Sequence, residues 1–99
     1  MLEKIRFQKN VPGDLENILN AYELISISGA NKVRSEIQRT LELIASFPEM
    51  YATIEQEIRL VKTRNYPLLV QYVIVNDIPV VLSVYHSDLN DFKLKENDA

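Results

Sequence analysis

The sequence has no cysteine and a single histidine among its 99 residues. Without cysteine, a disulfide framework and thiolate chemistry are both excluded. One histidine, with no carboxylate cluster at ligand spacing, gives metal binding no support, and we expect no cofactor. No serine lies in a nucleophile-elbow context, so serine catalysis has no support either.

Long apolar runs are also missing. None approaches the roughly 20 residues that a membrane-spanning helix needs. Residues 1–7 lack the apolar stretch and small-residue cleavage site of a signal peptide. We therefore expect a cytoplasmic protein with no membrane partner.

Positive charge is in deficit, with 11 Lys and Arg against 14 Asp and Glu, for a net charge of −3. This balance argues against a strong non-specific nucleic-acid binder. A local basic patch remains open, because Lys62 and Arg64 lie mid-chain while acidic residues gather near the C-terminus.

What is present suits one globular domain: 46% hydrophobic and 25% charged residues over a length that supports a single core. We expect that domain to span residues 1–87. Residues 88–99 make up a polar tail whose apolar residues include Phe92 and Leu94.

Apolar periodicity predicts a strand and two helices in the first half. Residues 3–9 alternate as in a half-buried strand. Helical spacing then predicts a helix over about 12–26 and a second one, capped by Ser28 and ended by Pro48. The two apolar stripes are Leu15, Ile18, Leu19, Tyr22 and Ile25, and then Ala30, Val33, Ile37, Leu41, Ile44 and Phe47. We expect an antiparallel helical hairpin covering one face of a sheet.

The second half predicts three strands after a connector without clear period at 50–56. They span 57–63, 66–75 and 78–85, the last two joined by a hairpin turn at Asn76-Asp77. Pro79 is tolerable near the start of a strand. The order is β-α-α-β-β-β, an α+β fold with a helical hairpin on a twisted four-stranded, mainly antiparallel sheet.

Three segments in this order resemble the RelE/ParE superfamily of bacterial toxins. The second helix ends in a Phe-Pro turn, an Arg-bearing strand precedes a Tyr-Pro strand, and a Val-rich strand ends in His. The segments are Leu43-Ile44-Ala45-Ser46-Phe47-Pro48-Glu49-Met50, then Arg59 with Tyr66-Pro67-Leu68-Leu69-Val70-Gln71-Tyr72, and Val80-Val81-Leu82-Ser83-Val84-Tyr85-His86. The resemblance covers residues 3–87 and implies the toxin of a type II toxin–antitoxin system.

Two departures decide between branches of that superfamily. Ribonuclease members commonly carry Arg where this chain has Pro67, and many members have Arg where it has Ser83. The Tyr-Pro form is typical of ParE-like members, also called plasmid stabilisation proteins, which are described as poisoning DNA gyrase. The resemblance thus favours a non-enzymatic inhibitor of gyrase. The alternatives are a RelE-like endonuclease that cleaves mRNA on the ribosome, and a non-toxic descendant kept as a binding module.

If the chain is a nuclease, the candidate catalytic residues are Arg59, Lys62, Arg64, Tyr85 and His86. RNA cleavage needs a base, an acid and cations for the phosphorane. The structural alternatives are a solvated strand face for the cations, a terminal hydrogen bond for His86 and packing for Tyr85.

The resemblance also implies a cognate antitoxin that wraps the toxin, with no direct DNA binding expected in its absence. We expect the antitoxin to dock on the face of the sheet that the helices leave bare, where the cations gather. The candidate binding residues are Arg59, Arg64, Phe92 and Leu94.

Overall fold

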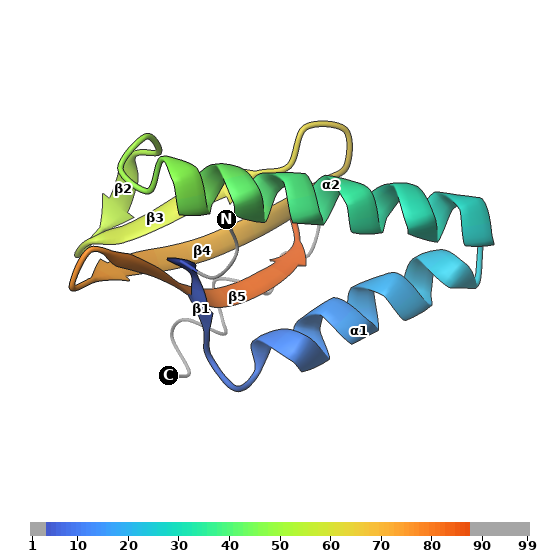
Figure 1. Ribbon diagram of the computed structural model, residues 1–99. Helices are drawn as coiled ribbons and strands as arrows, with labels where there is room; N and C mark the ends of the chain where they lie inside the picture. The colour runs from blue at the N-terminus through green and yellow to red at the C-terminus, as the bar shows by residue number, and fades with distance from the viewer. Residues whose placement is uncertain (1–3, 88–99) are drawn as a thin grey trace.

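The structure, a computed structural model, describes residues 4–87 and has two helices and five strands. In chain order these are β1 (Arg6–Phe7), α1 (Val11–Glu23), α2 (Ile27–Ser46), β2 (Thr53–Glu55), β3 (Ile58–Lys62), β4 (Leu68–Val75) and β5 (Ile78–His86). α2 runs across the sheet, and α1 lies beside it along β5 (Figure 1). The predicted α+β class with a helical hairpin on the sheet is confirmed. Within residues 4–87, neither helix has the length and apolar character needed to cross a membrane.

The five strands form one sheet in the order β1-β5-β4-β3-β2. Strands β2 to β5 are antiparallel neighbours, and β1 returns to the edge parallel to β5. The central position of β4 agrees with its nearly continuous apolar sequence. Its hairpin with β5 turns at Asn76 and Asp77, whose φ values of 53° and 70° match the favoured two-residue hairpin turn.

The sheet has one strand more than the four predicted. The additional strand, β2, lies inside the segment that was predicted to be a connector. Gln56 and Glu57 adopt φ values of 48° and 74° and close a second two-residue hairpin between Glu55 and Ile58. Sequence patterns missed this turn because neither residue is the Asn or Gly that such turns favour.

The helical hairpin turns two residues earlier than predicted. Ser26, not Ser28, caps α2: its Oγ accepts the Gly29 N–H at 2.8 Å, and Ser28 lies inside the helix. Gly29 leaves room for that hydroxyl, since a Cβ there would lie 2.8 Å from it. Gly29 therefore belongs to the first turn of α2.

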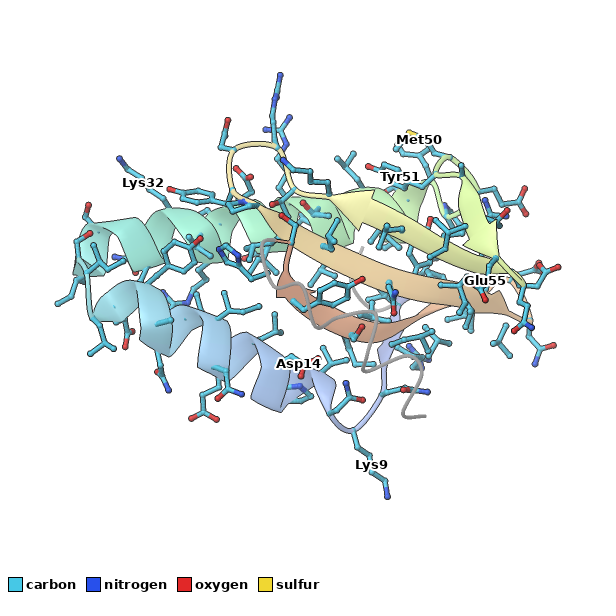
Figure 2. The ribbon with its side chains drawn as sticks, turned by 180° about the vertical axis from the view of Figure 1, so that it is seen from behind. Lys9, Asp14, Lys32, Met50, Tyr51 and Glu55 are labelled. Carbon is cyan, nitrogen blue, oxygen red and sulfur yellow. The ribbon has the colours of Figure 1, made fainter. Side chains whose placement is uncertain are left out.

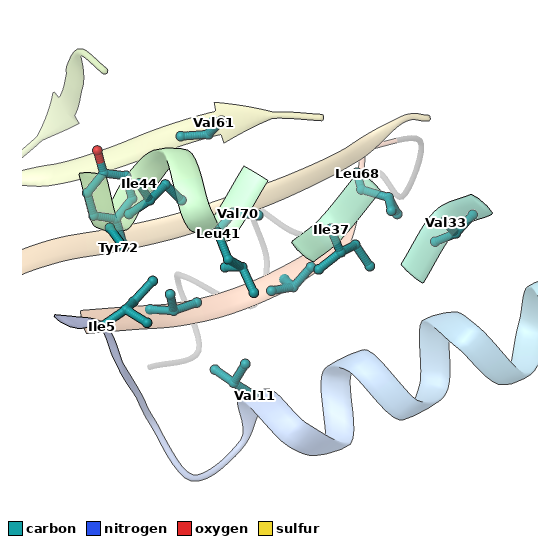
Figure 3. Packing of buried hydrophobic residues seen from close by; sticks show 13 residues of the cluster. Ile5, Val11, Val33, Ile37, Leu41, Ile44, Val61, Leu68, Val70 and Tyr72 are labelled. Atoms are coloured by element: carbon teal, nitrogen blue, oxygen red, sulfur yellow. The ribbon is translucent and has the colours of Figure 1, made fainter. Parts of the chain in front are cut away.

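The core lies between the helices and the sheet (Figure 3). From α2 the predicted stripe is buried at Ala30, Val33, Ile37, Leu41 and Ile44. The prediction is wrong for the last residue of each apolar stripe. Ile25, from the first stripe, is 82% exposed, and Phe47, from the second, is 57% exposed. Both lie at helix ends, where the chain has already turned away from the core.

A bulge in β5 joins the start of α1 to the sheet. Gln71 pairs with Ser83 but Tyr72 pairs with Val81, so Leu82 is an extra residue in the ladder. The Leu82 carbonyl accepts the Asn10 side-chain amide at 2.9 Å. The Val84 N–H donates to Asp14 Oδ2 at 3.2 Å, and Figure 2 shows Asp14 on the first turn of α1. The side chains of Asn10 and Asp14 thus provide hydrogen-bond partners for main-chain groups of β5 that do not pair with β1.

Candidate functional site

The two faces of the sheet separate the candidate residues. Successive residues of a strand point to opposite faces, and residues paired across strands share a face. Leu68, Val70 and Tyr72 of β4 are fully buried and face the helices. The other side, which we name the outer face, carries Leu60, Lys62, Leu69, Gln71, Val73, Ser83 and Tyr85.

Arg59 faces the helices, not the outer face. It pairs with Tyr72, and its Nη1 donates to the carbonyls of Tyr51 at 2.5 Å and Glu49 at 3.4 Å. The guanidinium thereby holds the segment that follows α2 against β3. Its position contradicts the expectation that the cations gather on the surface the helices leave bare. Arg59 and Lys62 are three positions apart in one strand, and an odd separation puts two residues on opposite faces.

Lys62 and Tyr85 are the two nuclease candidates that lie on the same face near each other. Both pair with Leu69, one from each side, so their backbones are about 10 Å apart, two inter-strand spacings. Lys62 is exposed, whereas Tyr85 is 8% exposed.

A neutral hydrogen-bond chain occupies the middle of the outer face. Ser83 Oγ donates to Gln71 Oε1 at 3.2 Å, and Gln71 Nε2 donates to the Tyr85 hydroxyl at 3.0 Å. Ser83 is thus joined to two other polar side chains of the outer face. The three side chains of this chain supply dipoles, and none of the three carries a positive charge.

His86 lies on the helix side, at the end of β5. It pairs with Leu68, and the Tyr22 hydroxyl of α1 lies 3.5 Å from its Nε2. The two rings stack with centroids 6.5 Å apart, and Tyr66 meets Tyr22 edge-to-face at 5.7 Å. The three rings join α1, the β3–β4 loop and β5.

Next to His86, a cleft of about 370 Å³ runs between α1 and β5. The cleft is lined mainly by apolar and aromatic groups, among them Ile18, Ala21, Tyr22 and Val84.

Arg64 is exposed in the loop between β3 and β4. The loop is held to α2 by Glu36, whose carboxylate accepts the backbone N–H groups of Asn65 and Tyr66 and the Asn65 side-chain amide. Thr63 closes the loop from within, donating from Oγ1 to the Tyr66 carbonyl at 2.5 Å. Sequence reasoning missed this role of Glu36, because residue spacing carries no signal for a contact 29 residues away.

The candidate set is therefore dispersed. Arg59 and His86 share the helix side but pair with β4 residues four positions apart, about 13 Å along the strand. Lys62 and Tyr85 lie across the sheet from them. Phe92 and Leu94, the remaining binding candidates, fall outside the described residues. Within residues 4–87, no group of three or more His, Asp or Glu side chains is placed to hold a metal ion.

Comparison with known proteins adds a structural relationship. No family model matches the sequence, and no curated protein matches it. Among solved structures, a chain of the chromosomal ParDE TA (toxin–antitoxin) system from P. aeruginosa superimposes with a TM-score of 0.72. The match covers 85% of this chain and 95% of that chain at 15% sequence identity.

This chain has a ParE-like fold. The fold implied by the three sequence segments is confirmed, since the helical hairpin and the three-strand meander follow in the predicted order. At this level of identity the relationship concerns the architecture alone.

Proposed function

We propose that this protein is the toxin of a type II toxin–antitoxin system. It acts by protein–protein contact on DNA gyrase, in the cytoplasm, and a cognate antitoxin neutralises it. The architecture shared with a chain of a ParDE TA system supports the toxin assignment. The observation that carries the contact mechanism is the division of the candidate nuclease side chains between two faces of the sheet.

Metal-free RNA cleavage would need a general base, a general acid and a cation around a single phosphate. Arg59 is bound to two carbonyl groups on the helix side, and Ser83 places a hydroxyl where a cation would be needed. Lys62 with Tyr85 supplies one cation and one buried phenol. Arg6, another cation that strand pairing places on the outer face, lies opposite Val80, five residues from Tyr85 along β5. Its backbone is therefore remote from that pair, which favours binding over catalysis.

The outer face and the adjoining edge of β3 suit an antitoxin segment. β2 pairs with β3 at Ile58 and Arg59, and within residues 4–87 no strand continues that pairing along residues 60–62. An extended segment could add there as a further strand, with main-chain hydrogen bonds and side chains against Leu60. Lys62 and Arg64 are exposed beside this edge and would favour acidic residues in the segment.

The C-terminal tail forms a separate part of this proposal. Phe92 and Leu94 are apolar residues in a polar stretch and would add contact area to the antitoxin complex. Deleting residues 88–99 and measuring antitoxin affinity tests this part. Unchanged affinity would remove the tail from the interface.

Two assays on the purified chain test the mechanism. We expect it to inhibit supercoiling by gyrase and to leave mRNA intact in a translating extract. The variant with Lys62→Ala and Tyr85→Phe is the matched control, because it removes the two neighbouring nuclease candidates and should leave gyrase inhibition unchanged. Transcript cleavage that this variant abolishes would establish the RelE-like alternative. Unaffected growth, with neither activity, would indicate the non-toxic descendant.

The antitoxin itself is tested through the genome. A short reading frame adjoining this one should encode a protein that binds this chain and relieves its effect on growth. Co-purification of the two products would support the pairing.

A further inference from the structure

The turn between α1 and α2 carries the most exposed large apolar side chains among the described residues. Leu24, Ile25 and Ile27 are 89%, 82% and 73% exposed, and we name these three residues the hairpin tip. Residues 24–31 contain no charged side chain, in a chain where a quarter of the residues are charged. Figure 1 shows the connection between the helices projecting beyond the sheet.

The fold does not require apolar residues at the hairpin tip. The turn is held by main-chain groups and by Ser26, and its side chains contribute nothing to the core. Polar residues at positions 24, 25 and 27 would form the same turn and avoid exposing hydrocarbon to water. An exposed apolar cluster with no role in the fold points to a binding surface.

The hairpin tip is also ordered before it meets a partner. The Tyr22 carbonyl accepts the N–H groups of Ile25 and Ser26, both at 3.0 Å. Ser26 then accepts the Gly29 N–H on its side chain and the Ala30 N–H, at 3.1 Å, on its carbonyl. A turn fixed by four hydrogen bonds loses little backbone freedom on binding. Less of the favourable free energy of its apolar contacts is therefore offset by the entropy cost of ordering the turn.

We propose that the hairpin tip is the anchor by which this protein seats in an apolar pocket of its target protein. The inference rests on the proposed function and names the surface that contacts the target. A convex, uncharged projection fits a concave apolar site on a partner. Three side chains supply only a fraction of the roughly 800 Å² per partner that a stable interface buries, so contact between two tips is too small for a dimer. As an anchor within a larger interface, the same side chains can dominate the affinity.

The position of the hairpin tip separates target binding from neutralisation. The edge of β3 proposed for the antitoxin lies on the sheet, and the tip lies at the end of the helices that extends past it (Figure 1). The target and the antitoxin would therefore meet different side chains. A substitution at the tip should affect one partner and spare the other.

The test uses the full chain with Leu24→Ser, Ile25→Ser and Ile27→Ser together. A matched control carries Phe47→Ser and Met50→Ser, which remove two apolar side chains that are 57% and 55% exposed near the other end of α2. We expect the tip variant to weaken gyrase inhibition at least about tenfold and to reduce growth arrest on induction. The control should inhibit as the parent does. Both variants should keep the parent's circular dichroism spectrum and its affinity for the antitoxin within about twofold.

The outcomes distinguish this inference from the proposed function. A tip variant that inhibits gyrase and arrests growth as the parent does overturns the inference while the proposed function stands. The inference is also overturned if the tip variant loses affinity for the antitoxin, because the tip would then contact the antitoxin. The same holds if the parent is a dimer in solution and the tip variant is a monomer, because the tip would then be a dimer contact. If the parent arrests growth without inhibiting gyrase, the gyrase proposal fails. The role of the tip is then decided by whether the tip variant arrests growth less than the parent does. A parent without either activity overturns both.

Discussion

Tyr72 links the centre of the sheet to the segment that follows α2, and its ionisation is expected to lower the stability of the fold at alkaline pH. The side chain is fully buried, and its hydroxyl donates to the Pro48 carbonyl at 2.6 Å. Burial raises the pKa of Tyr72 from its ordinary value of 10.0 to about 12, and the nearby Arg59 guanidinium opposes part of that rise. The folded protein therefore holds a proton that the unfolded chain releases more readily.

The sign of the effect follows from this difference. A group whose folded pKa lies above its unfolded pKa contributes its full stability below the unfolded value. That contribution is lost as pH rises from 10 through the folded pKa of about 12. Each pKa unit corresponds to about 1.4 kcal/mol, so the whole contribution is about 3 kcal/mol, of which about half is lost by pH 11.

The substitution Tyr72→Phe isolates this contribution. Near neutral pH the variant should be less stable than the parent by about 1 kcal/mol, because the partly buried Pro48 carbonyl loses its donor. Above pH 10 the parent should lose stability that the variant keeps, so the gap narrows and reverses near pH 11. Tyr66→Phe, in a partly exposed ring, controls for removal of a phenol.

Urea unfolding followed by circular dichroism at pH 8, 9, 10 and 11 measures the two free energies of unfolding. The expected result is a difference between parent and Tyr72→Phe that changes by more than about 1 kcal/mol over this range. A constant difference from pH 8 to pH 11 would refute the reasoning, because it would show that Tyr72 releases its proton equally well in both states.

Three further predictions concern parts that position the surfaces. Glu36→Gln replaces one accepting oxygen by a donor facing backbone N–H groups; we expect a loss of about 1–3 kcal/mol in urea unfolding and faster amide exchange in residues 63–67. Gln56→Asn with Glu57→Gly should raise the free energy of unfolding by about 1 kcal/mol, since both positions have positive φ. An unchanged midpoint of urea unfolding would show that the β2–β3 turn is unstrained. Ser26→Ala should cost about 1 kcal/mol in thermal unfolding while Ser28→Ala costs little, and the reverse ranking would contradict the observed cap.

The element order follows from local patterns because each pattern acts over a few residues. The stripe of α2 predicts its buried face, and Pro48 accounts for the end of the helix. The continuous apolar run of β4 predicts a strand buried at the centre of a sheet. The Asn76-Asp77 turn fixes the register of the last hairpin, because few other residue types adopt that backbone conformation without strain.

Local patterns were weaker where competing choices differ little in energy. Ser26 and Ser28 are both acceptable caps, and packing of the two helices decides between them. The β2–β3 turn forms from residues with no turn preference, because pairing with β3 holds them in place. Because α2 is capped at Ser26 and not at Ser28, Ile25 lies in the exposed hairpin tip and not in the predicted core.

By itself, the sequence determined the helical hairpin, the meander and the opposite orientations of Arg59 and Lys62, since alternation along one strand fixes their relative faces. Only the tertiary structure decided which of those faces the helices cover, because that depends on contacts between elements far apart in the chain. It turned Arg59 toward the carbonyls that follow α2, left Lys62 in solvent and bound Glu36 to a loop 29 residues away. The division of charged groups between the two faces, on which the proposed function rests, is therefore a property of packing.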